Sequence, residues 1–92
     1  GRAGGRYLDE SGALVFVCRE SRVTVTWAGH RATTELSGWG GVHVAQAFML
    51  PGGGRLVMLR HRGVTFESGY DEDVPLLLGP GGNSPGEGTP SP

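Results

Sequence analysis

The side chains that could perform nucleophilic catalysis or bind a metal are one cysteine and three histidines, Cys18, His30, His43 and His61. A thiol beside an imidazole is the pattern of a nucleophile with its base, and grouped histidines can ligate zinc. Cys18, however, ends an apolar run, which favours a buried and unreactive thiol. A single cysteine also excludes an internal disulfide and a cysteine-rich zinc site. His43 and His61 are expected on opposite faces of one hairpin, so we predict no catalytic and no metal-ligating residues.

A basic cluster at residues 60–62, Arg-His-Arg, is a candidate site for a phosphate or a carboxylate. We expect the acidic run at residues 71–73, or Glu67, to lie nearby and to neutralise this cluster at little net energy. The acidic run lacks the ligand spacing of a calcium loop. The three glycines at residues 52–54 precede a strand rather than the helix N-terminus that would bind a phosphate. The sequence therefore predicts no cofactor.

The composition limits the class of protein. A length of 92 residues accommodates at most one domain. A net charge of −1 argues against a dedicated nucleic-acid binder, and the absence of a polybasic run argues against attraction to a membrane surface. We find no apolar run of about 18 residues and no secretory leader, so we expect no membrane span. We expect the chain to be a processed form or a fragment of a larger protein.

Residues 13–27 predict two β-strands joined by a short polar turn. Residues 13–18 form a continuous apolar run, which is typical of a strand covered on both faces. Residues 22–27 alternate instead, with Val23, Val25 and Trp27 directed to one face. Further strands are expected where Ala32, Thr34 and Leu36 share a face and at residues 42–50, although residues 45–50 also contain good helix formers.

The strand interpretation of residues 42–50 is preferred because Pro51 and the glycines after it form a hairpin loop leading into residues 55–62. Gly63 is expected to end that strand, followed by a short strand at residues 64–67 and an acidic loop at residues 68–73. Residues 74–78 are predicted to be an edge strand or an extended cover, because Pro75 cannot donate a backbone hydrogen bond. Trp39, which lies among glycines, is expected to fold back on the core.

These patterns predict an all-β fold, a small antiparallel β-sandwich or partly open barrel of about six or seven short strands. The predicted domain covers residues 13–78. The glycine-rich residues 1–12 are expected to form a flexible leader. Residues 79–92 contain no large apolar side chain, which predicts a disordered tail or linker.

The predicted hairpin of residues 42–62 has two faces of different character. With Leu50 opposite Arg55, Phe48 faces Val57 and Val44 faces His61, and this side is expected to be core. The other side is more apolar than a solvated face needs to be, and it becomes basic away from the loop. Unless the segment at residues 76–78 or the tail covers it, a partner must do so. The predicted protein-contact residues are Met49, Met58, Leu56, Arg60 and Arg62.

The run from Cys18 to Trp27, Cys-Arg-Glu-Ser-Arg-Val-Thr-Val-Thr-Trp, resembles the opening of the N-terminal half of zona pellucida domains. In that family a cysteine leads into an alternating strand of an immunoglobulin-like sandwich. The resemblance implies a structural, self-associating module of an extracellular assembly, and it slightly favours an extracellular over a cytoplasmic location.

Three functions are thus weighed from the sequence. The first is a non-enzymatic protein–protein interaction module that binds a protein partner or itself. The second is the self-associating extracellular module that the resemblance implies. The third is a small thiol or metal-dependent enzyme that uses Cys18 and a histidine. We predict the first.

Overall fold

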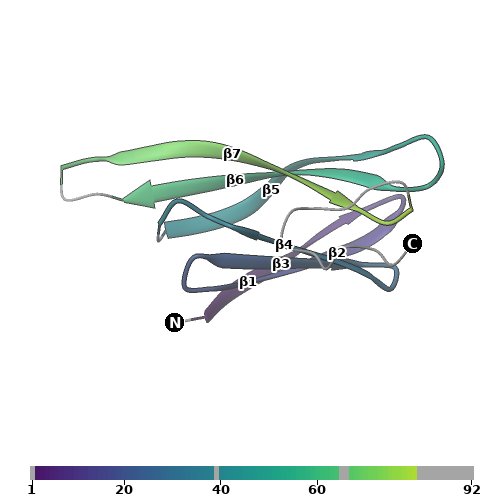
Figure 1. The fold of residues 1–92 in the computed structure, drawn as a ribbon, viewed down its shortest axis with the longest axis horizontal. Coiled ribbons are helices and arrows are strands. Elements are labelled where there is room, and N and C mark those ends of the chain that lie inside the picture. The colour runs from purple at the N-terminus through teal and green to yellow at the C-terminus, as the bar shows by residue number, and fades with distance from the viewer. Residues whose placement is uncertain (1, 39, 65–66, 81–92) are drawn as a thin grey trace, which may run out of the picture.

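The computed structural model describes residues 2–38, 40–64 and 67–80, which form seven antiparallel β-strands in two sheets (Figure 1). The predicted all-β class is confirmed, and so is the predicted number of strands. No helix within these ranges is long and apolar enough to cross a membrane. The strands are β1 (Arg2–Asp9), β2 (Gly12–Arg19), β3 (Arg22–Trp27), β4 (His30–Glu35), β5 (Gly40–Met49), β6 (Arg55–Val64) and β7 (Gly69–Leu78).

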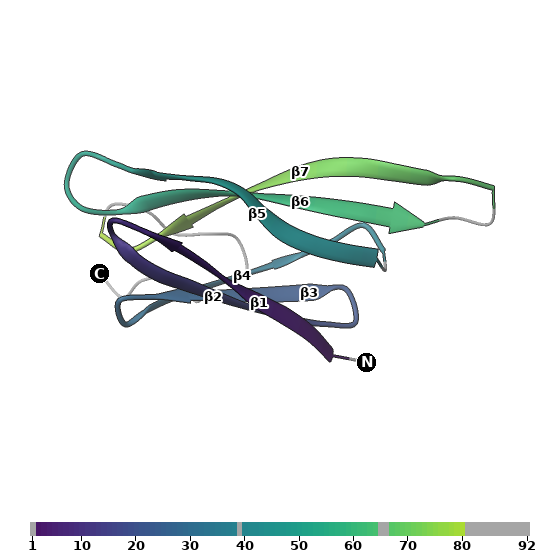
Figure 2. The same ribbon diagram turned by 180° about the vertical axis from the view of Figure 1, so that it is seen from behind.

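The chain completes one sheet before it begins the other. The first sheet has the order β1-β2-β3-β4 and the second the order β5-β6-β7, so neighbouring strands within each sheet are joined by hairpins. The two sheets lie face to face, with β4 beside β7 and β1 beside β5 (Figure 2). This succession, with a single crossing between the sheets, differs from the immunoglobulin-like connectivity that the resemblance implies, in which the chain crosses between the two sheets three times.

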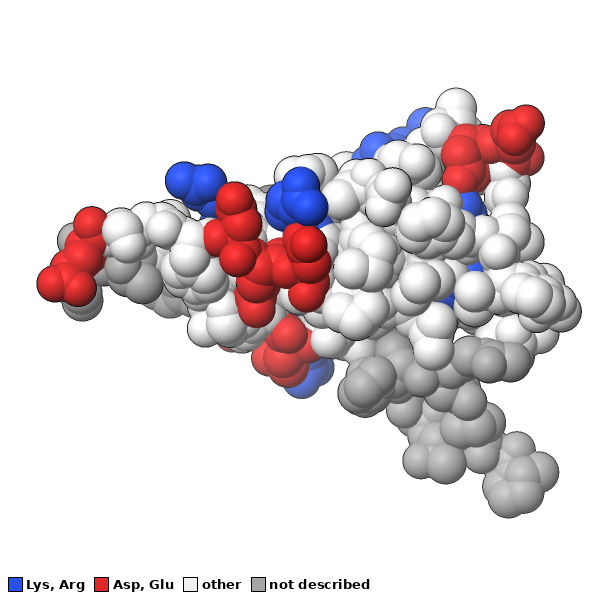
Figure 3. All heavy atoms as spheres, turned by 90° about the horizontal axis from the view of Figure 1, so that it is seen from above, with Lys and Arg blue, Asp and Glu red and all other residues white. Residues whose placement is uncertain are grey.

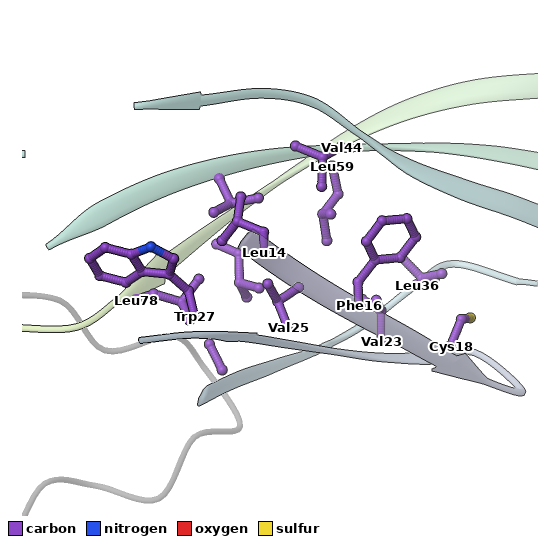
Figure 4. Close-up of a cluster of buried hydrophobic side chains, with 13 residues drawn as sticks. Leu14, Phe16, Cys18, Val23, Val25, Trp27, Leu36, Val44, Leu59 and Leu78 are labelled. Carbon is purple, nitrogen blue, oxygen red and sulfur yellow. The ribbon is translucent and has the colours of Figure 1, made fainter. Parts of the chain in front are cut away.

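The core lies between the inner faces of the two sheets (Figure 4). The alternation predicted for β3 is confirmed, because Val23, Val25 and Trp27 are all buried. The prediction that residues 13–18 are covered on both faces is wrong. β2 buries one row of side chains, while Val15 on the other face is 39% exposed, since no other element of the described residues covers that face. The buried apolar side chains are Leu14, Phe16, Cys18, Val23, Val25, Trp27, Ala32, Leu36, Val44, Val57, Leu59, Leu76 and Leu78.

The paired strands begin at Arg2, earlier than the expected boundary at residue 13, because β1 pairs with β2 along its whole length. Its glycines suit this strand because they lie against Phe16. A Cβ on Gly4 would lie 2.5 Å from the Phe16 backbone oxygen, and one on Gly5 would lie 2.8 Å from the Phe16 ring. Glycines that read as a flexible leader in the sequence therefore allow a close approach in the sheet.

The second sheet departs from expectation at the far end of its β6–β7 hairpin. Gly63 lies within β6 rather than ending it, and a Cβ there would lie 2.2 Å from the Tyr70 ring. Residues 69–73, expected in a loop, belong to β7 because they pair with residues 60–64. The prediction that residues 74–78 lie on an edge strand is confirmed. Trp39, residues 65–66 and residues 81–92, on which other predictions depend, lie outside the described residues.

The pairing of β5 with β6 confirms the strand interpretation of residues 42–50 but not the predicted register. Ala47, not Phe48, is opposite Val57, and Val44 is opposite Leu59 rather than His61. The register shifts between Val44 and Gln46, which is the mark of a β-bulge. The predicted core position of Phe48 is therefore wrong, and its side chain is 44% exposed.

The core predicts a clear contrast between two leucine substitutions. Leu59 is fully buried, so Leu59→Ala should lower the free energy of unfolding by about 2–5 kcal/mol through lost burial and a residual cavity. Leu8 is 73% exposed on the first sheet, so Leu8→Ala should change the free energy of unfolding by no more than about 0.5 kcal/mol. Urea denaturation followed by tryptophan fluorescence measures both values. Equal effects of the two substitutions would contradict the placement of the core.

Candidate functional site

The outer face of the three-stranded sheet, directed away from the four-stranded sheet, carries two adjoining zones (Figure 3). The apolar zone consists of Phe48, Leu56, Met58, Pro75 and Leu77. Phe48 and Pro75 are exposed, and the other three side chains are half-buried. The charged zone follows along β6 and β7, and it consists of Arg60, Arg62, Asp71 and Asp73.

The alternation of β6 sorts its side chains between the two faces. Arg55, Val57, Leu59 and His61 point toward the core, so the residues between them point outward. On β5 the bulge changes the alternation. Phe48 is thereby brought beside Leu56 on the outer face, while Gln46 lies opposite Met58.

The charged zone is neutralised by ion pairs between β6 and β7. The Arg60 guanidinium donates to the Asp73 carboxylate at 2.9 Å, and Arg62 donates to Asp71 at 3.2 Å. The hydrogen bond from Arg60 holds the pKa of the Asp73 carboxyl below its ordinary value. All four side chains are about half exposed or more, so these pairs add little to stability. The predicted neutralisation of residues 60–62 by residues 71–73 is confirmed.

Four of the five predicted contact residues share the outer face, since Leu56, Met58, Arg60 and Arg62 alternate along β6. The fifth, Met49, is opposite the buried Arg55 and therefore lies on the other face, where it is 48% exposed at the edge of the sheet.

Phe48 and Leu77 were not predicted on the outer face. Leu77 faces outward because it is opposite Leu56, whereas Leu76 and Leu78 are buried. The segment at residues 76–78 is thus part of the sheet and not a cover over this face. Once the register of β6 and β7 is known, their alternation predicts that Leu77 faces outward. No local sequence pattern, however, reveals the bulge that exposes Phe48.

A second polar cluster joins the segment after β4 to the second sheet, and the sequence did not indicate it. The Glu72 carboxylate accepts hydrogen bonds from the Ser37 hydroxyl at 2.7 Å, the Ser37 backbone N–H at 3.1 Å and His61 Nδ1 at 2.7 Å. The Ser37 hydroxyl is also 2.6 Å from the Tyr70 hydroxyl. The bonds from Ser37, and then that from His61, lower the pKa of the Glu72 carboxyl.

This cluster contains a serine, a histidine and a carboxylate, but their order differs from that of a catalytic triad. In a triad the histidine stands between the serine and the acid, so that it can take the hydroxyl proton. Here Glu72 stands between Ser37 and His61. The imidazole is fully buried, and its Nε2 has no hydrogen-bond partner in the described part of the chain. These hydrogen bonds link Ser37, on the segment between β4 and β5, to Glu72 of β7.

At the opposite end of the core, Arg55 of β6 forms an ion pair with Asp9 of β1 and so links the two sheets. The Arg55 side chain is 1% exposed, and its Cζ lies 5.2 Å from the centre of the Trp27 ring. The indole N–H of Trp27 donates to the Ser11 carbonyl at 2.7 Å. The hydrogen bond from Arg55 is the main cause that lowers the pKa of the Asp9 carboxyl.

Cys18 and the histidines lie on different strands. Cys18 is buried in β2, as predicted, and burial raises the pKa of its thiol. His30 of β4 stacks on Trp27, His43 lies on the outer face opposite Arg60, and His61 lies in the core. The described residues contain no group of three histidine, cysteine or acidic side chains that could hold a metal ion.

We compared the chain with protein-family models, with curated proteins and with solved structures, and none of them matches. What this protein does is therefore inferred from the side chains and surfaces described above.

The link between Asp9 and Arg55 predicts a pH-dependent loss of stability. Asp9→Asn leaves the buried Arg55 charge unpaired, so it should lower the free energy of unfolding at pH 7 by about 3 kcal/mol. Because the folded pKa of Asp9 lies below 3.8, the stabilisation is complete above that pH and is lost as the pH falls through the folded value. Urea denaturation between pH 7 and pH 2.5 should show the two proteins converging in acid.

The double variant Asp9→Asn/Arg55→Met is the control for this prediction. It removes the unpaired charge, so it should be more stable than Asp9→Asn alone. A difference between wild type and Asp9→Asn that does not change with pH would contradict the link.

The burial of Cys18 predicts slow labelling of the thiol. At pH 8 a disulfide reagent should modify the native protein at least about tenfold more slowly than the protein unfolded in urea, because a buried thiol with a raised pKa forms little accessible thiolate. Absorbance of the released thiolate follows the reaction. Equal rates in the two states would contradict the burial.

Proposed function

We propose that this protein is a non-enzymatic protein-interaction module, and that it contacts its partner through the outer face of β5, β6 and β7. The observation that carries the proposal is the apolar zone, in which Phe48, Leu56 and Leu77 lie side by side across the three strands. Contiguous apolar surface of this kind on a small domain is typical of a protein contact. An aromatic and a methionine side chain are also enriched in interface cores.

The ion pairs of the charged zone limit which charge a partner's surface can carry. Unpaired arginines at positions 60 and 62 would suit an acidic partner, but Asp73 and Asp71 already neutralise Arg60 and Arg62. Two arginines and two aspartates give the zone no net charge. A partner with its own balanced pattern of charge therefore fits this face better than an acidic one.

The polar clusters inside the fold support a non-enzymatic function. Arg55 and His61 each have a carboxylate partner on a neighbouring strand or the opposite sheet, and both are buried. Their contacts connect strands and sheets. The side chains exposed on the outer face are those of a contact surface.

Photo-crosslinking tests the proposal. The photoreactive benzoylphenylalanine is incorporated at position 48 or, as a matched control, at position 8, because Phe48 and Leu8 are both exposed apolar residues but lie on different sheets. After irradiation in the producing cells, we expect a defined protein adduct from position 48 and none from position 8. Adding Met58→Glu to the position 48 protein should abolish the adduct through a buried, unpaired carboxylate.

Thermal unfolding must show that the Met58→Glu protein is folded, which its half-buried position predicts. Equal adduct formation at positions 48 and 8, or an adduct unaffected by Met58→Glu in a folded protein, would contradict the assignment of this face.

A further inference from the structure

The outer face is self-complementary about a line between β6 and β7. Each outward residue of β6 is directly opposite a residue of like polarity or opposite charge on β7. Leu56 is opposite Leu77 and Met58 is opposite Pro75, whereas Arg60 is opposite Asp73 and Arg62 is opposite Asp71. The apolar and charged zones thus run across both strands at the same level along the sheet.

This pattern matches a two-fold axis that relates two copies of the sheet. The axis lies in the plane of contact, parallel to the strands and between β6 and β7. Such an axis exchanges the positions of β6 and β7 but keeps the level along the strands. It places Arg60 over Asp73 of the second copy and Met58 over Pro75 of the second copy. The self-complementarity that a symmetric dimer requires is already present in the register of the two strands.

We propose that the outer face binds a second copy of this chain, face to face about this axis. The inference rests on the proposed function, because it names the partner for the same face. In the dimer each arginine lies between an aspartate of its own chain and one of the other copy. No charge is left opposite a like charge, and the apolar side chains of β6 and β7 cover those of the second copy, while Phe48 on β5 flanks the contact.

The charge pattern favours a second copy over other partners. Asp71 and Asp73 accept hydrogen bonds from Arg62 and Arg60 at 3.2 Å and 2.9 Å. An acidic protein or a nucleic acid would have to compete with these two carboxylates for the arginines. A second copy makes the same kind of contact without breaking the pairs within the chain.

The edges of the sheet favour association through the face. The β7 edge contains Pro75, which has no backbone N–H to donate, and the β5 edge contains the bulge between Val44 and Gln46. Both features hinder the addition of a further strand.

The small size of the contact favours a weak and transient dimer. The two strands that face the second copy, β6 and β7, have ten residues each and give a contact of about 33 Å by about 10 Å, which is smaller than a standard specific interface. We therefore expect a weak dimer, with a dissociation constant in the micromolar range or above.

Sedimentation velocity of the purified 92-residue chain, from micromolar to millimolar concentration, tests the proposal. Wild type should shift from monomer to dimer. Arg60→Asp/Arg62→Asp makes the charged zone wholly negative, and Asp71→Arg/Asp73→Arg makes it wholly positive, so each should weaken self-association at least about tenfold. An equimolar mixture of these two variants should form a dimer again, since opposite zones then face each other.

Two further variants keep the test independent of folding defects. The fourfold exchange Arg60→Asp/Arg62→Asp/Asp71→Arg/Asp73→Arg retains every pair within the chain and should dimerise like wild type. Met58→Glu leaves the charged zone intact and should not dimerise. If wild type stays monomeric at millimolar concentration and the folded opposite variants do not associate when mixed, the second copy is excluded as the partner.

The crosslink from position 48 separates that outcome from failure of the proposed function. An adduct with the mass of two copies supports the dimer. An adduct with another protein overturns the dimer but leaves the interaction module standing. Absence of any adduct, together with a wild type that stays monomeric in sedimentation, removes both.

Discussion

The extra residue in β5, between Val44 and Gln46, is the constraint on which the second sheet depends. Before the bulge, Val44 faces the core opposite Leu59. After it, Ala47 faces the core opposite Val57, and Phe48 is directed outward. Unbroken alternation from Val44 would have placed Phe48 on the core side, because side chains repeat every second residue. One inserted residue therefore transfers the largest side chain of this strand from the interior to the surface and creates the apolar zone.

Buried polar groups link separate parts of the chain at each end of the sandwich. Arg55 bonds to Asp9 of the other sheet, and Trp27 beside it covers the guanidinium. At the other end Glu72 joins His61 to Ser37, which lies on the segment where the chain passes between sheets. Buried polar and charged groups are tolerated only when they are partnered, so Arg55 and His61, each with a carboxylate partner, connect parts of the chain that lie far apart in the sequence.

The outer face combines the two features that a weak, specific contact needs. The apolar zone supplies surface that gains by leaving water, whereas the charged zone sets orientation without adding net charge. Because Arg60 and Arg62 are already paired within the chain, selection of a partner in the proposed contact would depend on the order of charges along the strands rather than on their sum. The same register that builds the sheet arranges that order.

Local sequence patterns were enough to predict the all-β class, the inward row Val23, Val25 and Trp27, the burial of Cys18 and the neutralisation of residues 60–62. Each of these depends on a strand's own alternation or on charges that lie on adjoining strands. From the same patterns Leu56, Met58, Arg60 and Arg62 could be placed on one face, because β6 alternates without interruption. The exposure of Phe48, the inclusion of residues 2–9 in the first sheet and the links through Asp9 and Glu72 were decided by the tertiary structure. A bulge, a strand built of glycines against Phe16 and an ion pair between sheets each need a partner far away in the chain, and a single segment carries no information about which partner it meets.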